Sequence, residues 1–147
     1  MVAFRLMPAP LRRAAVRAGT PSYTVGAVAV LRGEDGRVLF VDQRHSGGWA
    51  LPGGLLRKGE CPDDAVIREV GEEVGVTLTP SSLPVPVAAV NARLRRVDLV
   101  YVLDAPSGAK PRQEDDAEVR RIGWYSLDVL PDVSDPTREI LHAVRML

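Results

Sequence analysis

Three glutamates with helical spacing lie near the middle of this 147-residue chain. Glu72 and Glu73 follow Glu69 by three and four positions, which places all three carboxylates on one face of a helix. Like charges this close repel one another, and the adjacent Arg68 offsets only part of that repulsion. Clustered carboxylates suit hard divalent cations such as Mg²⁺ or Mn²⁺, which prefer oxygen ligands. The spacing therefore indicates a metal site, and a solvated acidic face is the alternative interpretation.

The residues around these glutamates predict a helix with defined ends. Pro62 suits a first helical position because its φ is fixed and it lacks an N–H, and Asp63 and Asp64 favour the positive end of the helix dipole. Gly75 stands where a glycine commonly ends a helix. We therefore expect one helix from about Pro62 to Val74. Its apolar stripe is formed by Ala65, Val66, Ile67, Val70 and Val74.

The stretch from Gly54 to Val76 resembles the Nudix box, G-x5-E-x7-R-E-U-x-E-E-x-G-U, in which U is a bulky aliphatic residue. Every fixed position of the motif is matched, with nine specified positions inside 23 residues. The lead-in from Trp49 to Gly54 also resembles the family's usual approach to the box. The matching residues are Gly54, Glu60, Arg68, Glu69, Val70, Glu72, Glu73, Gly75 and Val76.

The resemblance implies a fold and a reaction. The fold would be the Nudix-type α/β/α sandwich, an α/β protein with a mixed β-sheet and a catalytic loop-helix-loop. Strands interleaved with a central and a terminal helix favour such layers independently. The reaction would be metal-dependent hydrolysis of a phosphoanhydride in a nucleoside diphosphate linked to another moiety, such as a nucleoside triphosphate or ADP-ribose. The alternative is a catalytically silent nucleotide-sensing module, which would be expected to have lost box acids; none is lost here.

The resemblance also assigns roles within the box. Glu72 and Glu73 would be the primary ligands of Mg²⁺ or Mn²⁺, and Glu69 would be a further ligand or the base that orients water. The main-chain carbonyl of Gly54 would be another ligand, which a tight glycine loop permits. The residues expected to serve catalysis are therefore Arg68, Glu69, Glu72 and Glu73.

Residues outside the metal cluster would complete the site. Glu60 and Arg68 would form an ion pair that fixes the loop against the helix. Members of the family often draw one more acid from a later loop. The candidates for it are Glu114 and Glu118, with Asp115 and Asp116 behind them.

Substrate contacts are expected near the loop that follows the second strand. The resemblance implies that an arginine at the end of this strand could reach a substrate phosphate, which makes Arg44 a candidate contact. His45 is expected to be a surface loop histidine. Trp49 could stack on a nucleobase, although a place in the core suits it equally well. The same two interpretations apply to Tyr101, Trp124 and Tyr125.

The sequence leaves the choice of nucleotide open. The downstream array SQPWPFPxS, associated with NADH hydrolysis, is missing. The proline that often marks ADP-ribose enzymes beyond the box is also absent, because Asn91 and Ala92 lie at that place.

Residues 1–20 carry four arginines and no acidic residue. Pro10, followed by Leu11 to Ala18 and Gly19, predicts a short amphipathic helix. We expect this basic arm to pack on the domain or on a partner subunit, which makes a homodimer a candidate assembly. Residues 21–147 would form a single Nudix domain.

The remaining elements alternate between strands and loops. Residues 105–117 are rich in proline, glycine and charge and predict a loop. A last helix is expected from Ser134 to Leu147, with Ile140, Leu141, Val144 and Leu147 facing the core. The expected strands are Tyr23–Leu31, Arg37–Asp42, Val76–Leu78, Val85–Leu94, Val97–Asp104 and Glu118–Ser126. Arg93, Arg95 and Arg96 are expected at a solvated hairpin end, and attraction of phosphate is the alternative.

Composition limits the partners. The net charge is zero and the isoelectric point is about 6.7, which gives no electrostatic reason to bind polymeric nucleic acid. No apolar run is long enough to span a membrane. The single cysteine, Cys61, is expected at a helix cap and fits a reducing cytosol, so a cytoplasmic location is expected. The expected partner is a small nucleotide.

Overall fold

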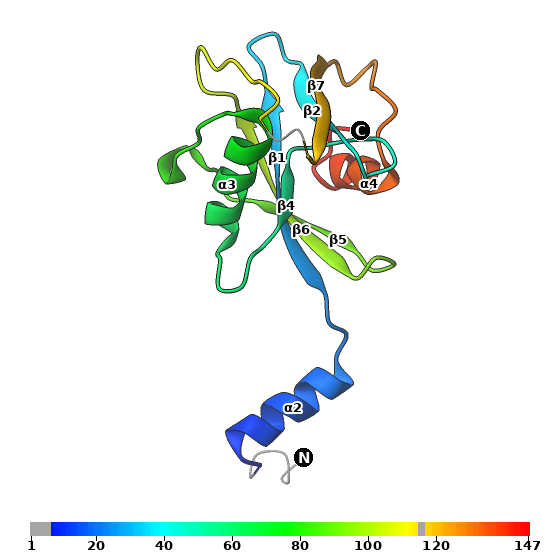
Figure 1. Ribbon diagram of the computed structural model, residues 1–147. Coiled ribbons are helices and arrows are strands. Elements are labelled where there is room, and N and C mark those ends of the chain that lie inside the picture. The colour runs from blue at the N-terminus through cyan, green and yellow to red at the C-terminus, as the bar shows by residue number, and fades with distance from the viewer. Residues whose placement is uncertain (1–6, 115–116) are drawn as a thin grey trace.

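The computed structural model describes residues 7–114 and 117–147, which form three α-helices, seven strands and one 3-10 turn (Figure 1). The helices are α2 (Ala9–Gly19), α3 (Pro62–Val74) and α4 (Asp135–Ala143), and the 3-10 turn is η1 (Pro80–Ser82). The strands are β1 (Thr24–Arg32), β2 (Val38–Gln43), β3 (Trp49–Ala50), β4 (Gly53–Leu55), β5 (Val87–Asn91), β6 (Arg96–Asp104) and β7 (Val119–Tyr125).

Strand β1 lies at the centre of a mixed sheet with the order β3-β2-β1-β6-β5. It pairs in parallel with β6 along its whole length and antiparallel with β4 over Gly26–Val28. Residues 26–31 are buried, as expected of an apolar strand covered on both faces. Strand β7 pairs with β2, and β5 forms an edge beside β6.

Helices α3 and α4 cover opposite faces of this sheet (Figure 1). Alternate residues of β1 point to opposite faces, so Ala27 and Ala29 pack in the same cluster as Val70 of α3, whereas Val28 packs with Leu141 of α4. The predicted α/β/α sandwich with a mixed sheet is therefore confirmed.

Helix α3 has the bounds that its sequence predicts. It begins at Pro62 with Cys61 at the N-cap position and ends at Val74. Gly75 follows in the left-handed conformation with φ of 65°, and its N–H donates to the carbonyl of Gly71. These local signals fix the register of the helix, and with it the face on which the glutamates lie.

The expected strand at residues 76–78 and the expected end of the last helix were both wrong. Residues 76–78 form no strand; Val76 and Leu78 instead fill the core on the α3 face without pairing to the sheet. Helix α4 ends at Ala143 rather than at Leu147, because Arg145 takes a left-handed backbone conformation with φ of 59° and reverses the chain. Leu147 is consequently exposed rather than in the core.

The loop between β5 and β6 is longer than expected, because it spans residues 92–95 rather than residues 95–96. Asn91 ends β5 because its side-chain oxygen accepts a hydrogen bond from the Leu94 N–H, which starts the turn. Arg95 completes the turn with φ of 49°. Arg96, expected at the solvated hairpin end, is instead the first residue of β6.

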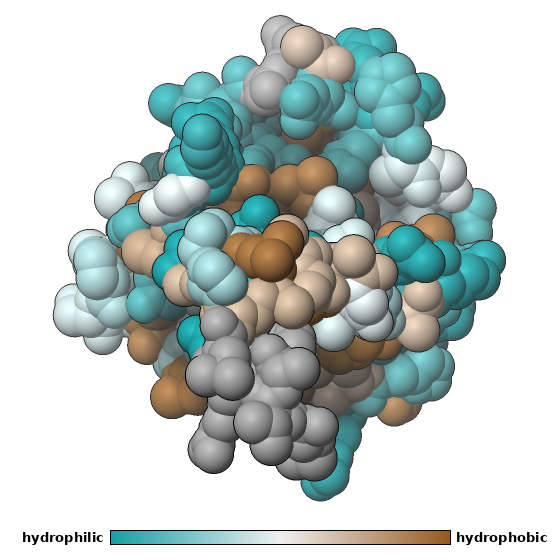
Figure 2. Space-filling view, turned by 90° about the horizontal axis from the view of Figure 1, so that it is seen from below, coloured by the Kyte–Doolittle hydropathy of each residue, from teal (hydrophilic) through white to brown (hydrophobic). Residues whose placement is uncertain are grey.

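Helix α2 stands away from the domain (Figure 1), and none of its residues is buried. The predicted helix is present, but it does not pack on the domain. Its apolar side chains are mostly alanines, which offer little surface to bury. Figure 2 views the molecule from the end that carries α2 and shows apolar and polar surface side by side there. No helix in the described part of the chain has the length and apolarity needed to cross a membrane.

Removal of residues 1–20 is expected to change the thermal unfolding midpoint of the remaining chain by less than about 2 °C, because α2 buries no side chain. The measurement is thermal unfolding of the full chain and of residues 21–147 at two protein concentrations. If the truncated chain had a lower unfolding midpoint than the full chain, and this difference grew with protein concentration, the expectation would be contradicted. The arm would then pack on a partner subunit.

Candidate active site

Strand β4 and helix α3 form a loop-helix unit in which the helix comes close to the strand backbone. Gly54 of β4 pairs with Ala27 of the central strand. A Cβ added to Gly54 would lie only 2.5 Å from Oε1 of Glu69. A side chain here would displace the carboxylate of Glu69, so the first glycine of the box lets this carboxylate lie against β4.

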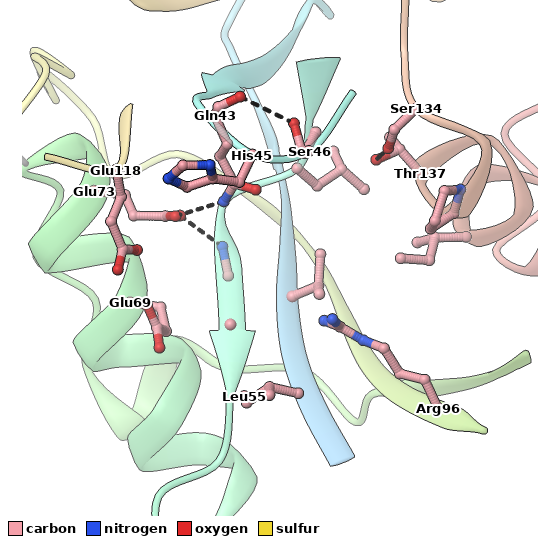
Figure 3. Close-up of a pocket in the computed structure, with 17 residues that line it drawn as sticks. Gln43, His45, Ser46, Leu55, Glu69, Glu73, Arg96, Glu118, Ser134 and Thr137 are labelled. Atoms are coloured by element: carbon pink, nitrogen blue, oxygen red, sulfur yellow. Dashed lines mark hydrogen bonds between the residues drawn. The ribbon is translucent and has the colours of Figure 1, made fainter. Parts of the chain in front are cut away.

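Glu73 is the most deeply buried of the three glutamates, with 2% of its surface exposed. Its carboxylate accepts hydrogen bonds from the Gly53 N–H at 2.8 Å and from Nε2 of Gln43 at 2.7 Å (Figure 3). Burial raises the pKa of Glu73 to about 7, although both hydrogen bonds oppose the shift. The charges of Glu69 and Glu118 raise the pKa further. Both donors that hold Glu73 are neutral, so this carboxylate lies where a cation would be stabilising.

Arg68 links the loop to the helix. Its Nε and Nη2 donate to the two carboxylate oxygens of Glu60 at 2.7 and 2.9 Å, and Nη1 donates to Oε1 of Glu69 at 2.6 Å. The hydrogen bonds from Arg68 and the Arg57 N–H lower the pKa of Glu60 to about 2. The pKa of Arg68 is raised, chiefly by its hydrogen bond to Glu60. The expected ion pair is present, and its role in fixing the loop stays a prediction.

Glu72 differs from its two neighbours because its side chain is 47% exposed. Oε1 of Glu72 lies 3.2 Å from Nη2 of Arg57, and Oε2 lies 3.2 Å from Nη1 of Arg68. The three glutamates therefore share a helix face, but they do not share one environment.

A cavity of 590 Å³ opens beside the loop-helix unit (Figure 3). Glu69 and Glu73 line it from α3, and Glu118 lies beside Glu73. Arg96 reaches into it from β6, and Thr137 lines it from the start of α4. The cavity thus joins an acidic side to a side formed by the sheet and α4.

The donors along the acidic side fit a hard divalent cation. Carboxylates of Glu69, Glu73 and Glu118 line one cavity, and the Gly54 backbone lines it too. In the described part of the chain, no three acidic, histidine or cysteine side chains converge closely enough to form a metal cluster. Glu69 is instead turned toward Arg68, and Glu73 toward its two neutral donors.

The two expected substrate contacts lie beside the cavity and are not among the described residues that line it. The N–H of Arg44 donates to the carbonyl of Glu118, and the Arg44 carbonyl accepts from Nη2 of Arg120. Trp49 packs edge-to-face on Tyr125 with ring centroids 5.1 Å apart, under the guanidinium of Arg121.

The candidates for the additional acid are separated by the fold. Glu118 lines the cavity, whereas Glu114 pairs with Arg112 and does not appear among the described lining residues. Asp115 and Asp116 lie outside the described residues. The fold therefore favours Glu118. Tyr101, one of the aromatic candidates, is fully buried and donates to Oδ1 of Asp63 at 2.5 Å.

Sequence reasoning missed three residues that line the cavity. His45 was expected at the surface, Arg96 was assigned to the hairpin end, and Gln43 was assigned no role. All three line the cavity. The two-residue period of β6 could have identified Arg96, because it places Arg96 on the same face as Asp98. His45 and Gln43 carried no comparable signal.

Residues 22–144 match the sequence profile of the NUDIX domain. The chain belongs to the Nudix hydrolase family. It is 31% identical to a MutT-like protein of Streptomyces ambofaciens over 127 residues, which are 86% of this chain and 77% of that protein. It is 32% identical over 126 residues to the human 8-oxo-dGDP phosphatase NUDT18, covering 81% of this chain but only 37% of NUDT18.

A solved structure shows the same fold. The MutT NUDIX hydrolase of Burkholderia pseudomallei superimposes with a TM-score of 0.69 at 33% identity, over 84% of this chain and 98% of that one. The expected family, the fold class and the assignment as a Nudix hydrolase are thus confirmed. Nudix hydrolases generally use divalent metals and act on small nucleotide substrates.

Replacing Arg68 by methionine is expected to lower the free energy of unfolding by more than an exposed ion pair contributes, because it leaves the half-buried Glu60 and Glu69 without their cation. Arg57→Met is the matched control; it removes only an exposed ion pair and is expected to lower the free energy by less than about 1 kcal/mol. Urea unfolding measures both. Equal losses in the two variants would contradict a linking role for Arg68.

The raised pKa of Glu73 predicts a pH dependence of stability in the presence of chelator. Between its ordinary value of 4.5 and about 7, the folded protein keeps a proton that the unfolded chain releases, so stability falls as the pH rises through this window. The loss should be complete above about pH 7 and amount to about 3 kcal/mol.

Glu73→Gln is the control for this titration because its side chain is uncharged at every pH. Between about pH 5 and pH 8, the unfolding midpoint of the wild type should therefore fall by roughly 5–10 °C more than that of Glu73→Gln. A shift in favour of the wild type would show that the folded state prefers the ionised carboxylate.

Proposed function

We propose that this chain is a divalent-cation-dependent pyrophosphohydrolase that cleaves a phosphoanhydride in a nucleoside diphosphate linked to another moiety. The observation that carries the proposal is the cavity that Glu69, Glu73 and Glu118 line beside the Gly54 backbone. Its volume of 590 Å³ is within the range of cavities that hold small ligands of nucleotide size. The complete Nudix box supports the same reaction.

The acidic side would hold Mg²⁺ or Mn²⁺ through Glu69, Glu72 and Glu73, the Gly54 carbonyl and Glu118. When bound, such an ion neutralises charge on the phosphates and lowers the pKa of coordinated water. The protein's own contribution is to hold these carboxylates in place. Gln43 and the Gly53 N–H fix the orientation of Glu73, and the link from Arg68 keeps Glu69 beside the loop.

In the proposed reaction, a water oxygen forms a bond to one phosphorus of the anhydride. The bridging P–O bond breaks, and its electron pair leaves with the departing phosphate. One proton of the water passes to Glu69, which then acts as the base, while Glu72, Glu73, the Gly54 carbonyl and Glu118 would hold the cation. Burial of Glu73 and the nearby charges of Glu69 and Glu118 make this side unfavourable for a bare polyphosphate, which is why the reaction is proposed to need the cation.

We propose nucleoside di- and triphosphates, including oxidised purine nucleotides, as the first substrate class to test. The human relative NUDT18 is an 8-oxo-dGDP phosphatase, which supports this choice. ADP-ribose remains in the panel because a relative from Methanocaldococcus jannaschii, 28% identical over 113 residues, is an ADP-ribose pyrophosphatase.

The test is phosphate release from a panel of nucleotides in Mg²⁺ and in chelator, with a coupled phosphatase where the product is a monophosphate. The panel contains nucleoside triphosphates and diphosphates, 8-oxo-dGTP and 8-oxo-dGDP, ADP-ribose, dinucleoside polyphosphates and sugar nucleotides. We expect Mg²⁺-dependent release from one class. No release from any nucleotide, together with measurable nucleotide binding, would instead indicate a silent sensing module.

Glu73→Gln is expected to lower kcat by at least about a hundredfold while leaving the fold intact, because it removes a buried carboxylate of the proposed cation site. It should also lose the rise in unfolding midpoint that Mn²⁺ gives the wild type. The control is Asp64→Asn, an exposed acid in the first turn of the same helix. Unchanged turnover and Mn²⁺ response in Glu73→Gln would refute the assignment.

A further inference from the structure

Arg96 is a cationic side chain in the cavity that the hydrolytic machinery does not use. It begins β6 and points into the cavity, on the side away from α3, while Glu69 and Glu73 enter from α3 (Figure 3). Strand β6 lies two strand spacings from β4 across the sheet, and the guanidinium of Arg96 reaches back over β1. A Cβ at Gly26 would lie 2.8 Å from Nη2 of Arg96 and 3.2 Å from the Gly54 carbonyl oxygen.

Asp98 holds the guanidinium of Arg96 in a fixed orientation. Nε of Arg96 donates to both carboxylate oxygens at 2.8 and 2.9 Å, and Nη2 lies 2.7 Å from Oδ1. Only 5% of Asp98 is exposed, so the pair is anchored in the sheet and its charges balance one another. Within the described residues, Nη1 is left with N–H groups to donate.

The neighbouring strand leaves room for this pair. Gly26 of β1 lies opposite Asp98 in the parallel register. A Cβ at Gly26 would clash with Oδ1 of Asp98 and would lie 2.8 Å from Nη2 of Arg96. Any larger residue at position 26 would displace the pair, so the sheet is built around the orientation of Arg96.

The surroundings of Arg96 are mainly apolar. Val28, Leu51 and Ile140 line this side of the cavity, and the hydroxyls of Ser134 and Thr137 bond to each other at 2.9 Å. An apolar wall with one fixed polar group is the kind of surface that binds a flat heterocycle and reads its edge. The acidic side, by contrast, suits a metal-bound diphosphate.

We propose that Arg96, held by Asp98, contacts the nucleobase of the substrate and selects bases that present a keto oxygen at that edge. The proposal rests on the proposed function, because it assumes that the acidic side takes the diphosphate. A guanidinium only donates hydrogen bonds, so a keto oxygen satisfies it, whereas an exocyclic amino group sets donor against donor. A site built this way rejects the unmatched base strongly, because the mismatch leaves polar groups unpaired.

Balanced charge favours the base over a phosphate as the partner of Arg96. The carboxylate of Asp98 cancels the long-range field of the guanidinium, which leaves a directional donor rather than a free cation. An arginine that serves a phosphate gains most when its charge is not already paired.

The test compares kcat/KM for inosine against adenosine nucleotides and for uridine against cytidine nucleotides, in the phosphate class that the full chain hydrolyses. The members of each pair differ by a keto or an amino group at one edge. We expect the wild type to prefer the keto member by about tenfold or more. Arg96→Gln, whose side-chain amide can donate to a keto oxygen or accept from an amino group, should bring the ratio near one.

A second variant guards against loss of the fold. Arg96→Met/Asp98→Val replaces the pair together, so no buried charge is left unpaired. It should also bring the ratio near one, with an unfolding midpoint close to that of the wild type. Arg93→Gln, an exposed arginine on the same hairpin, is the control and should keep the keto preference.

The proposal would be overturned if the wild type showed no keto preference, or if the variants left the ratio unchanged. It would also be overturned if the variants lowered kcat/KM equally for all four nucleotides, because Arg96 would then contact a phosphate. Binding of the monophosphates IMP and AMP, measured by thermal shift in chelator, separates this inference from the reaction. If the wild type hydrolyses no nucleotide, the proposed function fails. Tighter binding of IMP than of AMP that the variants lose would still support the role of Arg96. Equal binding of IMP and AMP by the wild type would refute that role.

Discussion

The close approach of the acidic face of α3 to the backbone of β4 is the constraint on which the rest of the site depends. Glycine at position 54 permits it, and the Gly53 N–H holds Glu73 at the point of contact. Repulsion among the glutamates would open such an interface, and the link that Arg68 forms with Glu60 and Glu69 opposes that repulsion. Glycine, glutamate and arginine positions of the box therefore act as one packing unit as well as a chemical one.

The sequence predicted those parts of the fold whose signals are local. Helix α3 has its expected bounds because Pro62 and Gly75 act within one turn of its ends. A strand was wrongly predicted at Val76–Leu78, because apolar alternation indicates burial but does not show whether a partner strand is available. The end of α4 depended on the backbone conformation of Arg145, a residue with no turn signature of its own.

In the candidate site too, the features with local sequence signals were predicted and those set by tertiary structure were not. Helical spacing placed the three glutamates on one face, but only the tertiary structure shows that Glu73 is buried while Glu72 remains half exposed. Arg44 was chosen by position along the chain, whereas its neighbours Gln43 and His45 line the cavity. A loop residue's direction is set by the backbone around it, and single-sequence reasoning does not reach that level of detail.

The pairing of β1 with both β4 and β6 has a consequence for how this protein could change its substrate. Hydrogen-bonded strands lie about 4.8 Å apart, so the separation between the glycine loop and the strand of Arg96 is about two strand spacings and is fixed by backbone geometry. No flexible loop sets that distance. Under the proposed assignment, side chains on β6 can therefore vary without altering the span from phosphate to base. The distance from phosphate to base and the choice of base are thereby set by different parts of the chain. The choice of base can then diverge between relatives while the distance is kept.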